Sequence, residues 1–159
     1  MRVRDDGTGT PAGIVALSPW LDFDHLAKLK HFNARRDAYI PTKRLRRVGR
    51  MVVGAHPELH HSPVNGALGG LPPTLMICGG DEVLRVDAEL MADRLDEADV
   101  PCTLQIWEGQ VHAFPVLTDL TPEGRLALEE IVAFVKEAVA APSKNRHVPR
   151  TVSSMGGVA

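Results

Sequence analysis

The pattern of apolar and polar positions between residues 71 and 114 organises the chain. Residues 74–78 (TLMIC) form a largely apolar run between a Pro-Pro and a Gly-Gly pair, which is typical of a buried parallel strand. Residues 102–107 (CTLQIW) alternate like a second strand. Between them, apolar residues recur at the helical spacing Leu84, Ala88, Met91, Leu95 and Ala98. A strand, a helix and a strand in this order predict a parallel unit with a right-handed crossover.

Two residues with potential chemistry follow these two strands. Asp81 comes just after the first strand, and His112 comes just after the second. Parallel strands end at the same edge of a sheet, so we expect both residues on one rim, where open α/β sheets place their sites. A carboxylate beside an imidazole can fix its tautomer and stabilise the imidazolium. Alternatively, Asp81 caps the following helix and His112 is a surface loop residue.

Three further segments complete the predicted α/β architecture. Residues 12–18 (AGIVALS) indicate another buried strand. Within residues 22–55, the helical spacing of apolar residues indicates a helix with a solvated basic face over an apolar stripe, which consists of Leu45, Val48, Met51 and Val52. Thr121-Pro122-Glu123 is typical of a helix start, and Pro142 ends this last helix. Its predicted inward stripe is Leu128, Val132, Val135 and Val139.

By length, the 159 residues form one domain, which we place at residues 12–141. Residues 1–11 are polar and rich in Gly and Pro, and we expect a flexible lead-in. Residues 142–159 are polar and carry Gly, Ser and Pro, which predicts a disordered tail.

Charge and composition limit which binding partners and which cellular compartment we expect. A formal net charge of −2 predicts neither nucleic acid nor an anionic membrane as partner. The opening MRVRDDGTGTPAG lacks the apolar segment of a signal peptide, and no apolar run reaches the ~20 residues of a membrane span. Cys78 and Cys102 would lie at opposite ends of two parallel strands, too far apart for a disulfide. We therefore expect a cytoplasmic protein with reduced core thiols.

A histidine cluster raises the question of a metal site. His56, His60 and His61 stand in the run AHPELHHSP, but Pro57 argues against one helix presenting the first two, and Glu58 is the only carboxylate nearby. We predict a loop there, without a metal, and no feature of the sequence points to a cofactor.

Several motifs in a fixed order connect the chain to a family. They are Leu17-Ser18-Pro19-Trp20-Leu21-Asp22, His61-Ser62-Pro63, Gly70-Leu71-Pro72-Pro73, Gly80-Asp81-Glu82-Val83-Leu84 and Val111-His112-Ala113-Phe114. With them, roughly residues 12–140 resemble the C-terminal part of an α/β-hydrolase of the hormone-sensitive-lipase type. The resemblance implies a carboxylic ester hydrolase acting on small-molecule esters without a cofactor. It also implies Asp81 as the triad acid and His112 as the general base.

The resemblance is incomplete, because the chain lacks the motifs for nucleophile and oxyanion hole. None of the serines (Ser18, Ser62, Ser143, Ser153 and Ser154) stands in a G-x-S-x-G elbow, and no H-G-G-G loop is present. We therefore predict a partial α/β-hydrolase fold, with about three parallel strands, flanking helices and the N-terminal half of the sheet missing. An open sheet edge of this kind invites self-association.

Two other functions stay open at this point. The chain could be a truncated, non-catalytic remnant or an interaction module that pairs through its open edge. More remotely, Gly79-Gly80-Asp81-Glu82-Val83 is similar to the GGDEF turn of diguanylate cyclases, although that turn joins antiparallel strands and here a helical pattern follows.

Overall fold

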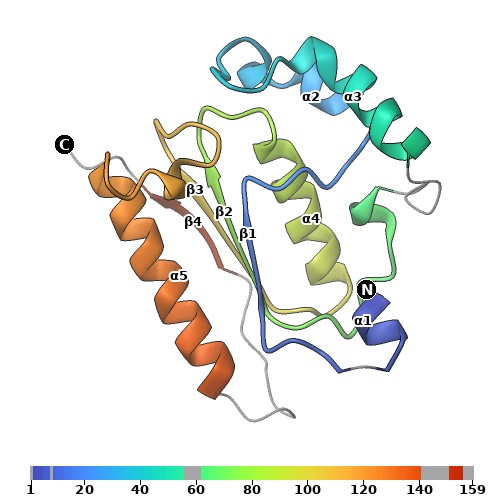
Figure 1. The fold of residues 1–159 in the computed structure, drawn as a ribbon, viewed down its shortest axis with the longest axis vertical. Coiled ribbons are helices and arrows are strands. Elements are labelled where there is room, and N and C mark those ends of the chain that lie inside the picture. The colour runs from blue at the N-terminus through green and yellow to red at the C-terminus, as the bar shows by residue number, and fades with distance from the viewer. Residues whose placement is uncertain (1, 8, 56–61, 141–150, 156–159) are drawn as a thin grey trace.

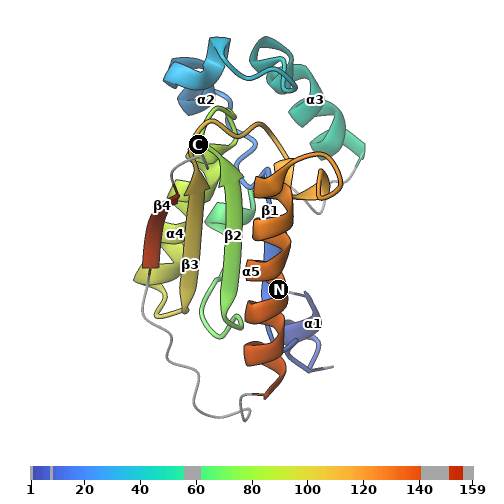
Figure 2. The ribbon, with the colours of Figure 1, turned by 90° about the vertical axis from the view of Figure 1, so that its left-hand side faces the viewer.

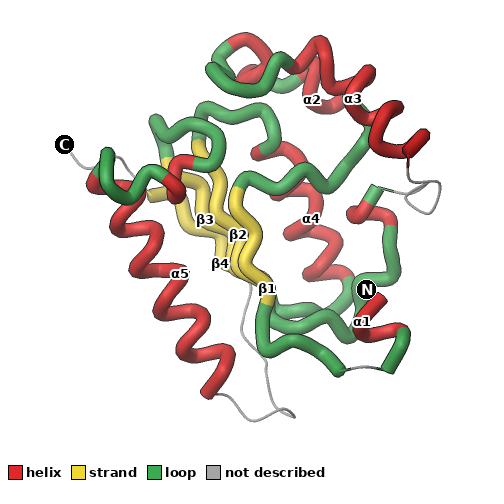
Figure 3. Tube along the Cα trace, viewed as in Figure 1, coloured by secondary structure: helices red, strands yellow, loops and turns green. Residues whose placement is uncertain are grey.

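The computed structural model describes residues 2–7, 9–55, 62–140 and 151–155. Their centre is a sheet of parallel strands, shown in Figure 1 and coloured by secondary structure in Figure 3. The strands follow in the order β1 (Ile14–Leu17), β2 (Thr74–Gly79), β3 (Cys102–Trp107) and β4 (Thr151–Met155). The three predicted strands are confirmed, and β4 is an addition to them.

Helices cover both faces of the sheet. Helix α4 (Arg85–Glu97) lies on one face and α5 (Pro122–Ala140) on the other (Figure 1). A third layer, α2 (Leu26–Lys30) and α3 (Thr42–Ala55), lies beyond the carboxyl ends of the strands (Figure 2). Among the described residues, no helix is long and apolar enough to cross a bilayer.

The predicted strand–helix–strand unit forms the larger core cluster. Ala88, Met91 and Leu95 of α4 are buried against residues of β2 and β3, among them Met76 and Leu104. All six residues of β2 are buried, as expected for a strand covered on both faces. The register pairs Thr74 with Cys102 and Gly79 with Trp107, so β2 and β3 end together at one rim.

The prediction for the inward face of α5 is wrong. Leu128, Val132, Val135 and Val139 are all exposed, Val139 to 70%. The helix instead packs through a neighbouring stripe, Ala127, Ile131 and Phe134, against β1 and β2. The sequence of α5 carries two adjacent apolar stripes, and periodicity alone could not say which one meets the sheet.

Structure extends beyond the predicted domain at both ends. Helix α1 (Arg2–Asp5) lies in the predicted flexible lead-in, and Arg4 donates hydrogen bonds to the carbonyls of Ala67 and Gly69, at 2.8 and 2.6 Å. Strand β4 pairs in parallel with β3, so the prediction of a disordered tail is wrong for residues 151–155. An edge strand is held by main-chain hydrogen bonds, which a polar composition does not reveal. The rest of the tail, 142–150 and 156–159, lies outside the described residues.

A buried ion pair joins the α2–α3 layer to α4. The Lys28 ammonium lies 2.6 Å from the Asp87 carboxylate, and both side chains are buried. Lys28 also donates to the carbonyls of Asp22 and Asp24, while Asp87 accepts from the amides of Leu21 and Asp22. Both charged groups therefore have several hydrogen-bond partners, which offsets the cost of burying two charges.

Candidate active site

The site lies where β2 and β3 end. His112 follows β3, and its Nδ1 lies 2.8 Å from Oε2 of Glu82, which follows β2. Glu82 is fully buried, while the His112 side chain is 25% exposed. The expected meeting of a carboxylate and an imidazole on this rim is found, although the carboxylate is the neighbour of the one we predicted.

Asp81 does not contact His112 in this arrangement. Its carboxylate lies 3.0 Å from the Arg36 guanidinium and is partly exposed. Its backbone amide donates to the carbonyl of Gln110, in the loop after β3. Asp81 lies in the turn that follows β2, and this turn directs Asp81 to Arg36 and Glu82 to His112. The sequence pointed to Asp81 rather than Glu82, because a sequence alone does not show in which direction each side chain points.

Two glycines allow the loop after β3 to approach β2 closely. A Cβ on Gly79 would lie 2.3 Å from the Gln110 carbonyl oxygen, and one on Gly80 would lie 2.9 Å from the Glu108 Cα. Both distances are shorter than any side chain tolerates, so this contact needs glycine. The close approach brings His112 within reach of Glu82, whose other oxygen accepts from the Gly79 amide at 3.2 Å.

The α2–α3 layer braces the turn that carries Glu82. The buried Asn33 side chain donates to the carbonyls of Gly80 and Glu82, at 2.6 and 2.9 Å. Asp37 accepts from the Val83 amide at 2.7 Å. These two residues hold the turn at two carbonyls and one amide. Sequence reasoning missed them, since they lie more than forty positions away and belong to no motif that we used.

A second brace holds the histidine loop. The Ser18 hydroxyl accepts a hydrogen bond of 2.8 Å from the amide of Ala113, next to His112. Ser18 and Ala113 have φ values of 46° and 56°, in the left-handed region that residues with a Cβ seldom adopt. Such conformations persist only where surrounding contacts enforce them, and they cluster at functional sites.

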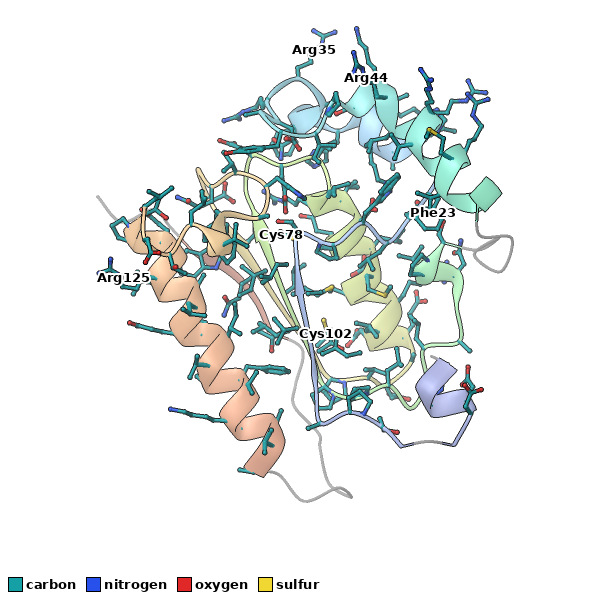
Figure 4. The ribbon with its side chains drawn as sticks, in the orientation of Figure 1. Phe23, Arg35, Arg44, Cys78, Cys102 and Arg125 are labelled. Carbon is teal, nitrogen blue, oxygen red and sulfur yellow. The ribbon has the colours of Figure 1, made fainter. Side chains whose placement is uncertain are left out.

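The electrostatics of the site favour a protonatable histidine. The hydrogen bond that Glu82 accepts from His112 raises the pKa of His112, against the opposing effect of burial, and the charges of Glu82 and Asp37 raise it further. Burial and the neighbouring Glu82 raise the pKa of the Cys78 thiol well above its usual value, so this cysteine is not an activated nucleophile. Cys78 and Cys102 are both buried, and they form no disulfide because they lie at opposite ends of the sheet (Figure 4).

The arrangement suits proton transfer at the second ring nitrogen. With Nδ1 engaged by Glu82, Nε2 can take a proton from a nucleophile and return it to a leaving group. Among the residues that the structure describes, no group of three or more His, Cys, Asp or Glu side chains could hold a metal ion. The prediction of a metal-free loop at His56, His60 and His61 falls outside the described residues.

Comparisons with known proteins agree with the sequence motifs. A family profile for the alpha/beta hydrolase fold matches residues 1–116. The chain is 35% identical over 136 residues to the esterase LipU of Mycobacterium tuberculosis, covering 80% of this chain and 46% of LipU. It is 36% identical over 138 residues to the carboxylesterase/phospholipase LipF of the same organism, covering 82% of this chain and 37% of LipF.

Solved structures give the same result. An esterase of the bacterial hormone-sensitive lipase family superposes with a TM-score of 0.81 at 29% identity, over 87% of this chain and 48% of the esterase. The esterase EstE5, soaked with p-nitrophenyl butyrate, superposes with a TM-score of 0.79, also at 29% identity, over 88% of this chain and 48% of EstE5.

This chain belongs to the α/β-hydrolase fold family, and its resemblance to the hormone-sensitive-lipase type is confirmed. It spans about half the length of the relatives it matches.

Proposed function

We propose that this chain supplies the general base and the orienting acid of a serine-type carboxylic ester hydrolase. The contact between His112 Nδ1 and Glu82 Oε2 carries the proposal. His112 would act as the base, and Glu82, in place of the predicted Asp81, as the acid that fixes its tautomer and stabilises the imidazolium. Small carboxylic esters are the proposed substrates, because the matched relatives are named as esterases.

The serine nucleophile and the oxyanion donors would come from a segment that completes the sheet beside β1. Among the described residues, β1 pairs on one side only, with β2. A groove of about 140 Å³ lies between β1 and α5, lined by apolar residues that include Val15, Phe134 and Val135. A further strand with its helix would cover both the groove and the exposed stripe of α5. Parallel strands are found almost only in sheets covered in this way.

The proposal can be tested by restoring the other half of the fold. The part of LipU that precedes the matched region is joined to this chain, and hydrolysis of p-nitrophenyl butyrate is measured. His112→Ala and Glu82→Gln should each lower kcat by about a thousandfold or more, because the base is lost or misoriented. Asp81→Asn is the matched control and should leave kcat within about twofold, since Asp81 contacts Arg36.

Three results would contradict this assignment. If His112→Ala leaves the rate unchanged, the chain supplies no base. If Asp81→Asn abolishes activity while Glu82→Gln does not, the acid is the residue first predicted. A folded chimera without activity would favour the alternative of a non-catalytic remnant or interaction module.

A further inference from the structure

The positive charge of this chain is concentrated in one layer. Nine of the eighteen Lys and Arg residues fall between Leu26 and Ala55, where Asp37 is the only acidic residue. The chain as a whole has a net charge of −2, so the rest of it is strongly acidic. The overall net charge does not reveal this segregation. From the net charge we predicted that the chain binds neither nucleic acid nor an anionic membrane.

Most of these cations point to solvent. Lys28 is buried against Asp87, and Arg36 pairs with Asp81. The other seven are exposed: Lys30, Arg35, Lys43, Arg44, Arg46, Arg47 and Arg50. Figure 4 shows Arg35 and Arg44 extending from the outer side of the α2–α3 layer, away from the sheet. The layer therefore presents a cationic outer surface.

Exposed apolar side chains share this layer. They are Leu26, Leu29, Tyr39, Val48 and Met51. Phe32 is also exposed, but its ring lies against the guanidinium of Arg85 on α4 and does not belong to the outer face. On α3 the spacing of Arg44, Arg47, Val48 and Met51 places cations and apolar side chains on one face. That face is turned away from the buried Leu45 and Gly49. Met51 is 63% exposed, so part of the predicted apolar stripe of α3 faces solvent.

We infer that the outer face of the α2–α3 layer docks on an anionic lipid surface. Lys and Arg side chains near such a surface are attracted by its negative potential. Apolar side chains among them can enter the headgroup boundary, where they leave water. Nucleic acid would contact only the cationic side chains and would leave the exposed apolar side chains without a partner surface. This inference goes beyond ester hydrolysis and uses residues other than Glu82 and His112.

The test is sedimentation of the purified chain with vesicles. Vesicles of phosphatidylcholine with about 30 mol % phosphatidylglycerol should bind the chain, while pure phosphatidylcholine should bind it at least about tenfold more weakly. Binding should weaken as salt rises from about 0.05 to about 0.5 M, because the Debye length shrinks.

Matched variants separate this face from the rest of the surface. Arg44→Gln with Arg47→Gln should weaken vesicle binding by about tenfold or more. Arg125→Gln with Lys136→Gln removes two exposed charges from α5 and should change binding by no more than about twofold. Met51→Ser, which alters no charge, should weaken binding severalfold. If the arginine double variant fails to fold, the Met51 variant and the salt dependence still decide.

Four outcomes would overturn the inference. These are absence of binding to the anionic vesicles, equal binding to neutral ones, equal loss in the α5 control, and binding to duplex DNA without binding to vesicles. A doubled mass in solution that the Met51 variant abolishes, without vesicle binding, would assign the face to a second copy of the chain instead. Each result is independent of the esterase chimera, so the two proposals can fail separately.

Discussion

At the scale of single residues, the site depends on which of two adjacent acids turns inward. Asp81 and Glu82 are both acidic and both follow β2, yet only Glu82 contacts His112. The choice has a measurable consequence, because the hydrogen bond and charge of Glu82 raise the pKa of His112 above its ordinary value.

We predict that Glu82→Gln lowers the pKa of His112, measured by NMR titration of the ring protons, because it removes the negative charge beside Nδ1. Asp81→Asn is the control and should shift that pKa little. The folded chain binds the His112 proton more tightly than the unfolded chain. The resulting stability is therefore complete below the ordinary pKa of His112 and is lost as pH rises through the raised value. A free energy of unfolding with the same pH dependence in the wild type and in Glu82→Gln would contradict this.

At the scale of elements, the α2–α3 layer is tied to the sheet by buried polar contacts. Asn33 and Asp37 brace the Glu82 turn, and Lys28 pairs with Asp87 on α4. Burial raises the pKa of Asp87, and the Lys28 ammonium and the amides of Asp22 and Leu21 oppose that rise. The charged pair is consequently an anchor that depends on both partners.

We predict that Lys28→Met lowers the free energy of unfolding by about 3–5 kcal/mol, because it leaves a buried carboxylate without its cation. The matched control is Lys30→Met, in the same helix but exposed, which should stay within about 0.5 kcal/mol. Denaturant unfolding measures both. Adding Asp87→Asn to Lys28→Met should restore part of the loss, and a double variant less stable than the single one would refute the anchor role.

At the scale of the whole molecule, the sheet has an unpaired edge at β1 among the described residues. The β1 edge, the groove beside it and the exposed stripe of α5 form a continuous apolar region. We proposed that the nucleophile-bearing part of the fold occupies it. A chain without that part should associate with itself through the same region.

We predict that Val135→Glu shifts the chain toward monomer in sedimentation velocity, because it places a charge in the groove beside β1. Ala133→Glu is the control, since Ala133 is exposed on a different side of α5 and should leave the association unchanged. A wild-type chain that stays monomeric at high concentration, or two variants that behave alike, would show that this region does not drive association.

The local pattern of apolar and polar residues was sufficient to predict the central strands and helix of the fold. Strand β2 follows from a short apolar run behind two prolines, α4 from a helical apolar stripe and β3 from an alternating run. Burial against neighbouring elements imposes these periods. Their order specifies parallel strands and a shared rim, and ordered motifs indicated the family. The positions of His112 and of a carboxylate near it follow from that topology.

Only the tertiary structure decided which side chains meet. The choice of Glu82 over Asp81 depends on the direction of the chain past the strand. The choice between the two stripes of α5 depends on how the helix packs on the sheet, where Ala127 is buried. The braces from Ser18, Asn33 and Asp37 join residues far apart in the chain. Such contacts arise from packing in three dimensions, on which local periodicity carries no information.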